Sequence, residues 1–311
     1  MPGWIVELVA LVGGFLALAQ GATWLVDGGA ALARRWGVKP MTVGLTIIAW
    51  GTSMPEVVVS RLAAYRGLPG ASVGNVVGSN VANIGLVLGV TGLILPAVLA
   101  TKLSGRDALW LVGSLGILWG FLLDTVLSRL EAIALVAAFL IYNVALFRSP
   151  SSKDVEEESA EHTAERPWVS VVVGSVSIGL GGWLVLYGAE NLALRAGVSE
   201  RVVGLTVLAI GTSLPELAAS VQSALRGHPA MGVGNVVGSN VFNSLAVLGI
   251  AGIMRPFALD TSEGIPRSLT LDFPTNLGFS LLLVALATLL RGGATRFAAA
   301  ALVLGYAGYI A

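Results

Sequence analysis

The sequence contains no cysteine and few charged residues. Of its 311 residues, 12% are Asp, Glu, Lys or Arg, about half of the ~25% that is typical of soluble domains. The absence of cysteine excludes a disulfide framework and a thiolate metal site. The 18 basic and 18 acidic residues give zero net charge, and without a basic cluster the chain is not expected to bind nucleic acid.

Long apolar runs dominate what remains. Hydrophobic residues make up 55% of the chain, and runs long enough to cross a bilayer, about 20 residues each, follow one another along nearly its whole length. The sequence therefore predicts an all-α polytopic membrane protein in contact with a lipid bilayer. The first run has no Lys or Arg before it and carries Glu7, which is the wrong flank for a signal peptide, so we expect it to be the first membrane helix.

The two halves of the chain repeat one another. Residues 44–89 align without a gap with residues 204–249 at a constant offset of 160, and 27 of these 46 positions are identical. Among these identities are the eight consecutive residues GNVVGSNV, which occur at 74–81 and again at 234–241. This pattern indicates an internal duplication.

A polar, acidic segment separates the halves. Residues 148–167 lack apolar periodicity and predict a solvated linker between a first repeat at 1–147 and a second repeat at 168–311. Turn residues and charges divide each half into five apolar segments, expected near 4–34, 40–66, 71–97, 107–123, 128–147, 167–195, 199–226, 231–254, 270–290 and 296–310. Because five is odd, the halves must enter the membrane from opposite sides. We therefore expect ten transmembrane helices as two inverted five-helix repeats, a transporter architecture with its site where the repeats meet.

Basic residues in the short loops predict the orientation. With the N-terminus outside, 11 of the 18 Lys and Arg residues fall on the cytoplasmic side and seven fall outside, which follows the tendency of cytoplasmic loops to be basic. We therefore expect a multi-pass protein of the cell (inner) membrane, with both termini outside and the acidic linker in the cytoplasm.

One carboxylate in each half lies in the middle of a predicted span. Glu56 ends the segment GTSMPE at 51–56, and its repeat mate Glu216 ends GTSLPE at 211–216. A carboxylate at this depth is costly, so it normally faces a cavity and marks an ion or substrate path. Neither spanning core contains a Lys or Arg that could pair with these residues. Both glutamates are therefore expected to form an ion site.

Further oxygen atoms surround these glutamates in the sequence. Pro55 and Pro215 each remove a backbone donor, and the carbonyls that they free are tolerated in a membrane where they line a cavity. Hydroxyl and amide side chains follow, and a spacing of four places Ser and Asn on one face of the next helix. Such oxygen ligands suit hard cations such as calcium and sodium. The full set of candidate ligands is Glu56, Glu216, Thr52, Thr212, Ser53, Ser213, Ser79, Ser239, Asn83, Asn243, Ala49 and Ala209.

Other small and polar residues have simpler explanations. The GxxxG pairs within 74–78 and 234–238 are typical of close helix packing. Asn side chains in the repeated motif either hydrogen-bond across helices or join the site; they are Asn75, Asn80, Asn235 and Asn240. Asp27 and Glu190 lie on the first helix of each half, where an acid facing a cavity or reaching the interface is more common than an ion ligand.

These motifs resemble those of a known family. The paired GTS(M/L)PE and GNVVGSNV segments are similar to the alpha repeats of the sodium/calcium exchangers, within the cation/calcium antiporter superfamily, and the resemblance covers essentially the whole chain. It implies a secondary active antiporter that exchanges calcium for sodium by alternating access. The transported ions would be calcium and sodium, and neither a cofactor, an obligatory protein partner nor an enzymatic activity is expected.

The resemblance also implies roles for the candidate residues. Glu56 and Glu216 would be the calcium carboxylates, helped by the carbonyls of Thr52 and Thr212. The flanking sodium sites would be completed by Ser53, Ser79, Ser213 and Ser239 with the carbonyls of Ala49 and Ala209. The first and sixth helices, here 4–34 and 167–195, would slide across the ion-binding core.

One position departs from part of the family. Asn243 stands where potassium-dependent members carry an aspartate, so the pocket holds two carboxylates, which balance one calcium ion. This departure argues against potassium co-transport. A proton-coupled calcium or other divalent-cation antiporter remains open, with Glu56 and Glu216 also carrying the protons. An intramembrane enzyme is a distant alternative, because the sequence has no Ser/His or Ser/Lys dyad at membrane depth and no HExxH motif.

Overall fold

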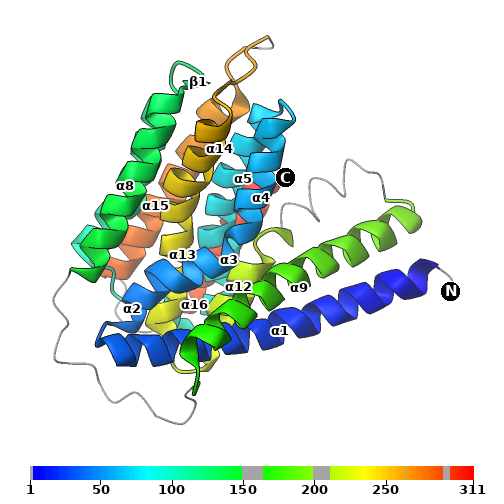
Figure 1. Cartoon of the computed structure of the whole chain (residues 1–311), viewed down its shortest axis with the longest axis vertical. Helices are drawn as coiled ribbons and strands as arrows, with labels where there is room; N and C mark the ends of the chain where they lie inside the picture. The colour runs from blue at the N-terminus through cyan, green and yellow to red at the C-terminus, as the bar shows by residue number, and fades with distance from the viewer. Residues whose placement is uncertain (1–2, 149–163, 199–210, 263, 290–294) are drawn as a thin grey trace.

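A computed structural model of the chain describes residues 3–148, 164–198, 211–262, 264–289 and 295–311. Nearly all of these residues are helical (Figure 1), which confirms the predicted all-α fold. The first half contains α1 (Gly3–Trp36), α2 (Pro40–Val43), α3 (Ala49–Thr52), α4 (Met54–Tyr65), α5 (Pro69–Ala82), α6 (Gly89–Ile94), α7 (Gly105–Phe121) and α8 (Arg129–Phe147). The second half contains α9 (Pro167–Arg195), α12 (Leu214–Leu225), α13 (Pro229–Phe242), α14 (Leu248–Met254), α15 (Phe273–Leu289) and α16 (Thr295–Ile310).

Short segments of other geometry join several of these helices. Four are π-helical, namely η1 (Gly44–Ile48), η2 (Asn83–Leu88), η5 (Asn243–Val247) and η6 (Ser268–Asp272), and η3 (Pro96–Val98) is a 3₁₀ turn. Two short strands that the sequence did not predict, β1 (Val126–Leu127) and β2 (Phe257–Ala258), pair antiparallel between the loops that follow α7 and α14.

The apolar helices fit a membrane protein that crosses the bilayer several times. Six described helices are long and apolar enough to span a membrane, and a bent pair formed by Pro40–Thr52 and Met54–Tyr65 raises the number to seven. Helix α16 is apolar but shorter. Part of the expected segment 199–226 and most of the linker lie outside the described residues. The total of ten spans therefore stays a prediction.

Helices α1 and α9 form a tightly packed antiparallel pair beside the remaining helices (Figure 1). A Cβ atom on Gly21 would lie 2.9 Å from the carbonyl oxygen of Gly174, and one on Gly181 would lie 2.8 Å from that of Gly14. Glycine is required at such positions because any side chain would push the two backbones apart. The contact glycines recur every seventh residue and at an offset of 160 between the helices; they are Gly14, Gly21, Gly28, Gly174, Gly181 and Gly188.

Two long, buried helices cross at the centre of the molecule. One is the continuous helix 69–94, formed by α5, η2 and α6, and the other is the helix 229–254, formed by α13, η5 and α14. Where they meet, Asn80 donates to the carbonyl of Asn240 at 3.3 Å and Asn240 donates to the carbonyl of Asn80 at 3.1 Å. These reciprocal bonds join residues that are equivalent in the two repeats, so both halves contribute to this contact in the same way.

The expected span at 40–66 bends by 49° between α3 and α4. The bend lies at Ser53, whose φ and ψ are −88° and 10°. Pro55 lies in the first turn of α4, where its missing N–H costs nothing because the first helical N–H groups have no intrahelical acceptor. The second half repeats this geometry, since Ser213 has φ and ψ of −91° and 3° and Pro215 opens α12. The repeated Ser-x-Pro sequence thus places a helix start in the interior of the protein.

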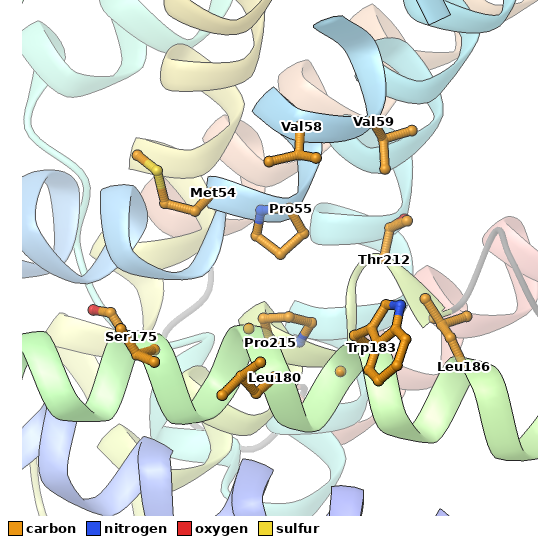
Figure 2. A pocket seen from close by; sticks show the side chains of 14 residues that line it. Met54, Pro55, Val58, Val59, Ser175, Leu180, Trp183, Leu186, Thr212 and Pro215 are labelled. Atoms are coloured by element: carbon orange, nitrogen blue, oxygen red, sulfur yellow. The ribbon is translucent and has the colours of Figure 1, made fainter. Parts of the chain in front are cut away.

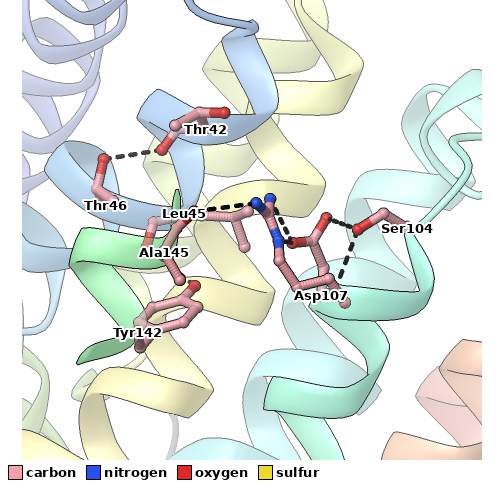
Figure 3. Close-up of polar contacts among 8 residues, drawn as sticks. Thr42, Leu45, Thr46, Ser104, Asp107, Tyr142 and Ala145 are labelled. Carbon is pink, nitrogen blue, oxygen red and sulfur yellow. Dashed lines mark hydrogen bonds and ion pairs between the residues drawn. The ribbon is translucent and has the colours of Figure 1, made fainter. Parts of the chain in front are cut away.

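A polar cluster fixes the segment that leads to this bend (Figure 3). On α7, Arg106 pairs with Asp107 at 3.1 Å and donates to the carbonyl of Ala145 on α8 at 3.2 Å. On α8, the hydroxyl of Tyr142 donates to the carbonyl of Leu45 in η1 at 3.5 Å. Helix α8 therefore holds both α7 and the π-helical segment just before the bend.

Candidate functional site

The two glutamates lie at equivalent helix starts. Glu56 is in the first turn of α4 and Glu216 is in the first turn of α12, and both side chains are fully buried, with 0% exposure. The free N–H groups and the helix dipole favour negative charge at a helix N-terminus. Each Ser-x-Pro segment therefore delivers a carboxylate to the interior at the start of a helix that partly stabilises it.

A first-half hydroxyl contacts the second-half carboxylate. Ser53, which caps α4, donates from Oγ to Oε1 of Glu216 at 2.8 Å. The other carboxylate oxygen of Glu216, Oε2, accepts no hydrogen bond from a described residue. Since Ser53 belongs to the helix start that carries Glu56, this bond places both glutamates at one site built from both repeats.

The equivalent contact in the other direction is absent from the described residues. Neither carboxylate oxygen of Glu56 accepts a hydrogen bond from a described residue, and the hydroxyl of Ser213, the mate of Ser53, is likewise without a partner there. Burying a carboxylate without donors costs several kcal/mol or more. The cost falls when a cation lies beside the carboxylate, so the surroundings of Glu56 fit a place for a positive ion.

Asn235 joins the two helix starts. Its side-chain nitrogen donates to the hydroxyl of Ser220 at 2.9 Å and to the backbone carbonyl of Glu216 at 3.3 Å. Its side-chain oxygen accepts the hydroxyl of Thr52 at 3.1 Å. Asn235 has 0% exposure, so this buried amide is largely satisfied by the groups around the site.

The remaining candidate residues differ in how they are engaged. Asn83 donates to the side-chain oxygen of Asn240 at 3.0 Å. Asn243, at the start of η5, is fully buried and neither its nitrogen nor its oxygen has a partner among the described residues. Buried Ser239 is also without such a partner, and Ser79 is 4% exposed. Asn83 and Asn243 each begin a π-helical segment, a geometry frequent at functional sites.

The carbonyl and threonine ligands expected from the sequence differ in their hydrogen bonds and in their burial. The carbonyl of Ala49 already accepts the backbone N–H of Ser53 at 3.0 Å and the hydroxyl of Thr52 at 3.3 Å. Thr52 is buried, whereas Thr212 is only half-buried. Ala209 lies outside the described residues.

An apolar cavity of about 460 Å³ lies beside this site (Figure 2). Helix α9 forms one wall, with Leu180 and Trp183 among its residues, and the two helix starts form the other, with Pro55, Thr212 and Pro215. The two proline rings lie between α9 and the glutamate-bearing helices (Figure 2). The helix that the resemblance expects to slide thus faces the two bends with a cavity between them.

The described residues test one of the two GxxxG pairs. Cβ atoms on Gly234 and Gly238 would come within 3 Å of backbone atoms of Met41 and Leu45, which confirms close packing in the second half. A Cβ on Gly74 or Gly78 would meet no described residue within 4 Å, and residues 201 and 205, the repeat mates of Met41 and Leu45, lie outside the described residues. Close packing of the first-half pair therefore stays a prediction.

Asp27 makes an ion pair instead of facing the candidate ion site. It pairs with Arg226, at the end of α12, at 3.1 Å. Nearby, Gln222 of α12 donates to the hydroxyl of Thr23 of α1 at 2.9 Å. These contacts tie α1 to a glutamate-bearing helix.

Sequence reasoning left Ser60 and Ser220 out of the site region. Asn75 donates to Ser60 at 2.9 Å, as Asn235 does to Ser220. The signal was present, since both serines follow a glutamate by four residues and are identical between the halves. A comparison of the repeats beyond the conspicuous motifs could have found them.

Comparison with known proteins adds an independent observation. The sequence model described as sodium/calcium exchanger protein matches residues 6–148 and 166–311. The putative antiporter CaxA of Alkalimonas amylolytica is 38% identical over 83% of this chain and 84% of its own. The sodium/calcium exchanger MaX1 of Methanosarcina acetivorans is 27% identical over 90% of both chains. A solved structure of the sodium-calcium exchanger NCX_Mj aligns with a TM-score of 0.81 at 27% identity and covers 97% of both chains.

Proposed function

The chain belongs to the sodium/calcium exchanger family, and from this premise we propose that it exchanges calcium for sodium across a membrane by alternating access. It is a transporter rather than an enzyme, and sodium and calcium are its substrates. The match covers both halves and nearly the whole length of the solved exchanger, so the complete transport unit has a counterpart in this chain.

The observation that carries the proposal is the buried carboxylate of Glu56. Both of its oxygens lack a donor among the described residues, and Glu216 uses only one of its own. Two buried carboxylates with three free oxygens supply the charge and the oxygen ligands that a calcium ion prefers. Sodium, also a hard cation, suits the same kind of ligand.

We assign the candidate residues their roles on this basis. Glu56 and Glu216 bind calcium, together with the carbonyls of Thr52 and Thr212. Sodium binds beside them, at the hydroxyls and amides of Ser53, Ser213, Ser79, Ser239, Asn83 and Asn243. Ala209 joins these ligands through its carbonyl, and the carbonyl of Ala49 does so once its hydrogen bonds rearrange.

The arrangement in the membrane forms part of the proposal. Residues 1–147 and 168–311 are two inverted five-helix repeats in the cell (inner) membrane, with both termini outside and the linker at 148–167 in the cytoplasm. Alternating access follows when the α1–α9 pair slides past the helix starts. The cavity between α9 and the two prolines supports this movement, because the residues that line it are almost all apolar and no polar contact between the described residues has to break there.

Calcium uptake into proteoliposomes tests the function. The purified protein is reconstituted with sodium inside, and entry of radioactive calcium is followed at fixed pH after dilution into sodium-free buffer. Uptake that requires the outward sodium gradient, and persists when a protonophore removes any pH gradient, is the expected result. Uptake driven by a proton gradient without sodium would contradict the assignment of sodium as the counter-ion.

Potassium independence is tested in the same vesicles. The pocket offers two glutamates and the neutral Asn243, so no third carboxylate is present to hold a second monovalent cation. We expect sodium-driven calcium uptake to be unchanged when potassium is replaced by choline on both sides. A requirement for potassium would overturn this part of the proposal.

A further inference from the structure

We propose that Asn75 and Asn235 are positioning residues that alternately fasten the two glutamate-bearing helix starts during transport. In the described arrangement Asn235 holds the Thr52 hydroxyl; in the arrangement open to the opposite side, Asn75 holds the Thr212 hydroxyl instead. The inference rests on the proposed function, because it assigns these residues to the exchange between the two arrangements.

We call the hydrogen bonds of Asn235 the second-half bracket and the equivalent bonds of Asn75 the first-half bracket. All bonds of the second-half bracket are formed in this structure. Asn235 spans α12 through the hydroxyl of Ser220 and the carbonyl of Glu216, at 2.9 and 3.3 Å. It then reaches across the repeat boundary to Thr52 at 3.1 Å. Ser220 is itself anchored, since its hydroxyl donates to the carbonyl of Gly232 on α13 at 3.3 Å. The amide therefore fixes the first turn of α12 relative to the end of α3.

The first-half bracket has the same anchor but not the same reach. Asn75 donates to Ser60 at 2.9 Å, and Ser60 donates to the carbonyl of Ser72 at 3.4 Å. These bonds match those of Asn235, Ser220 and Gly232 at the offset of 160. No hydrogen bond joins Asn75 to Thr212, and both residues are only half-buried. Ser60 thus holds Asn75 in place within the first half, while the bond from Asn75 to Thr212 is not formed.

A second contact shows the same asymmetry. Ser53 bonds Glu216 at 2.8 Å, whereas Ser213 and Glu56 have no partner among the described residues. Both cross-repeat bonds therefore run from the bend after α3 to the second half. In a transporter built from two inverted repeats, each half can adopt the conformation that the other half has. The hydrogen bonds that the first half makes here therefore predict a second arrangement, in which the equivalent residues of the second half make them instead.

The consequence for transport is a shift in population. A hydrogen bond that exists in only one arrangement stabilises it over the other, typically by a factor of roughly two to ten. Removing the Thr52–Asn235 bond should favour the opposite arrangement, and removing a Thr212–Asn75 bond should favour the described one. The KM for calcium should then rise on one face of the membrane and fall on the other.

The experiment compares right-side-out and inside-out vesicles. Sodium-driven calcium flux is measured in both, and the ratio of the two KM values is determined for Thr52→Val and Thr212→Val. Valine keeps the shape and the backbone carbonyl and removes only the hydroxyl. We expect the ratio to move by roughly two- to tenfold in opposite directions for the two variants, with Asn235→Ala and Asn75→Ala moving it in the same directions as their partners.

The matched control is Thr46→Val. Thr46 is buried in η1 and its hydroxyl bonds only its own helix, at the carbonyl of Thr42, at 2.8 Å (Figure 3). Its KM ratio should equal that of the parent protein. A ratio that is unchanged in both threonine variants, or that moves in the same direction in both, overturns the proposal.

A second measurement does not depend on which ions are transported. Because the chain has no cysteine, Val198→Cys, just after α9, and Leu68→Cys, between α4 and α5, provide a unique pair of spin-label sites. Distances measured by pulsed electron resonance should show two populations, whose balance shifts oppositely in Thr52→Val and Thr212→Val. If the parent fails to exchange calcium for sodium but the populations still shift, the proposed ions are wrong and the bracket stands.

Discussion

Glu56 and Glu216 occupy equivalent places in the two halves, yet their surroundings differ. Ser53 donates to Glu216, while no described residue donates to Glu56. The structure therefore distinguishes two residues that the sequence treats as equal. In its charged form each needs a cation or a hydrogen-bond donor to offset the cost of burial, and this cost determines what substitution should do.

Replacing either glutamate by glutamine should abolish calcium transport and leave the protein folded. Glu56→Gln and Glu216→Gln each remove one of the two charges that balance calcium, so we expect at least a hundredfold loss of sodium-driven uptake. Stability should hold or rise, because a neutral amide is less costly to bury than a carboxylate. Uptake assays and thermal unfolding in detergent check the two expectations. Retained uptake in either variant would show that its glutamate does not bind calcium.

Asn243 offers a test of the neutral position in the pocket. Both polar atoms of this side chain are buried without a partner among the described residues, so we expect Asn243→Leu to lose sodium affinity, raising the KM for sodium about tenfold, since sodium would lose an amide oxygen ligand. Asn243→Asp places a third acid near two others, and one of the three should take up a proton. Its flux should therefore depend on pH or potassium where that of the parent does not. Normal transport by both variants would mean that the side chain faces away from the ions.

At the scale of elements, the α1–α9 pair depends on glycine at the contact. Gly21→Ala and Gly181→Ala would place a Cβ within 3 Å of the facing backbone, so we expect each to lower the free energy of unfolding by about 1–3 kcal/mol. Gly13→Ala and Gly179→Ala are the matched controls, because nothing lies within 4 Å of a Cβ there. Thermal unfolding in detergent compares the four. An equal loss in the controls would mean that the helices are not held by close approach.

Removing one or the other of two ion pairs of α1 should affect the exchange rate differently. Arg226 pairs with Asp27 and ties α1 to α12, whereas Arg195 pairs with Glu7 and ties α1 to α9, which slides with it. A partly exposed pair that must break in every cycle slows that step, so Arg226→Gln should raise the exchange rate about two- to fivefold at low salt. Glu7→Gln should lower thermal stability without changing the rate. Turnover measured at low and high salt distinguishes these outcomes, and a faster Glu7→Gln variant would contradict the assignment.

For the whole molecule, the acidic linker should be a connector only. Its composition is that of a solvated segment, and α8 and α9 end and begin at Phe147 and Pro167 on either side of it. We expect deletion of residues 151–165 to change the exchange rate by less than about twofold. A Gly/Ser linker of the same length is the matched control, because it removes the acids but keeps the reach. Loss of exchange in both proteins would assign the linker a regulatory role.

The sequence by itself determined the class of protein and the duplication, and it predicted which residues bind the ions. Hydropathy and the two mid-span carboxylates could be recognised without knowledge of contacts, because a charged group in the middle of an apolar span is costly whatever its partners. Pro55 and Pro215 likewise predicted a break in the helix, since proline lacks an N–H wherever it occurs.

Only the tertiary structure decided how equivalent residues differ. Identical motifs must give identical predictions, so the sequence could not show that the hydroxyl of Ser53 bonds Glu216 while that of Ser213 has no partner among the described residues. The bond from Ser53 to Glu216 also lies between the repeats. Such contacts join segments that are far apart in the sequence, so they are a property of the folded arrangement of the chain rather than of its order of residues.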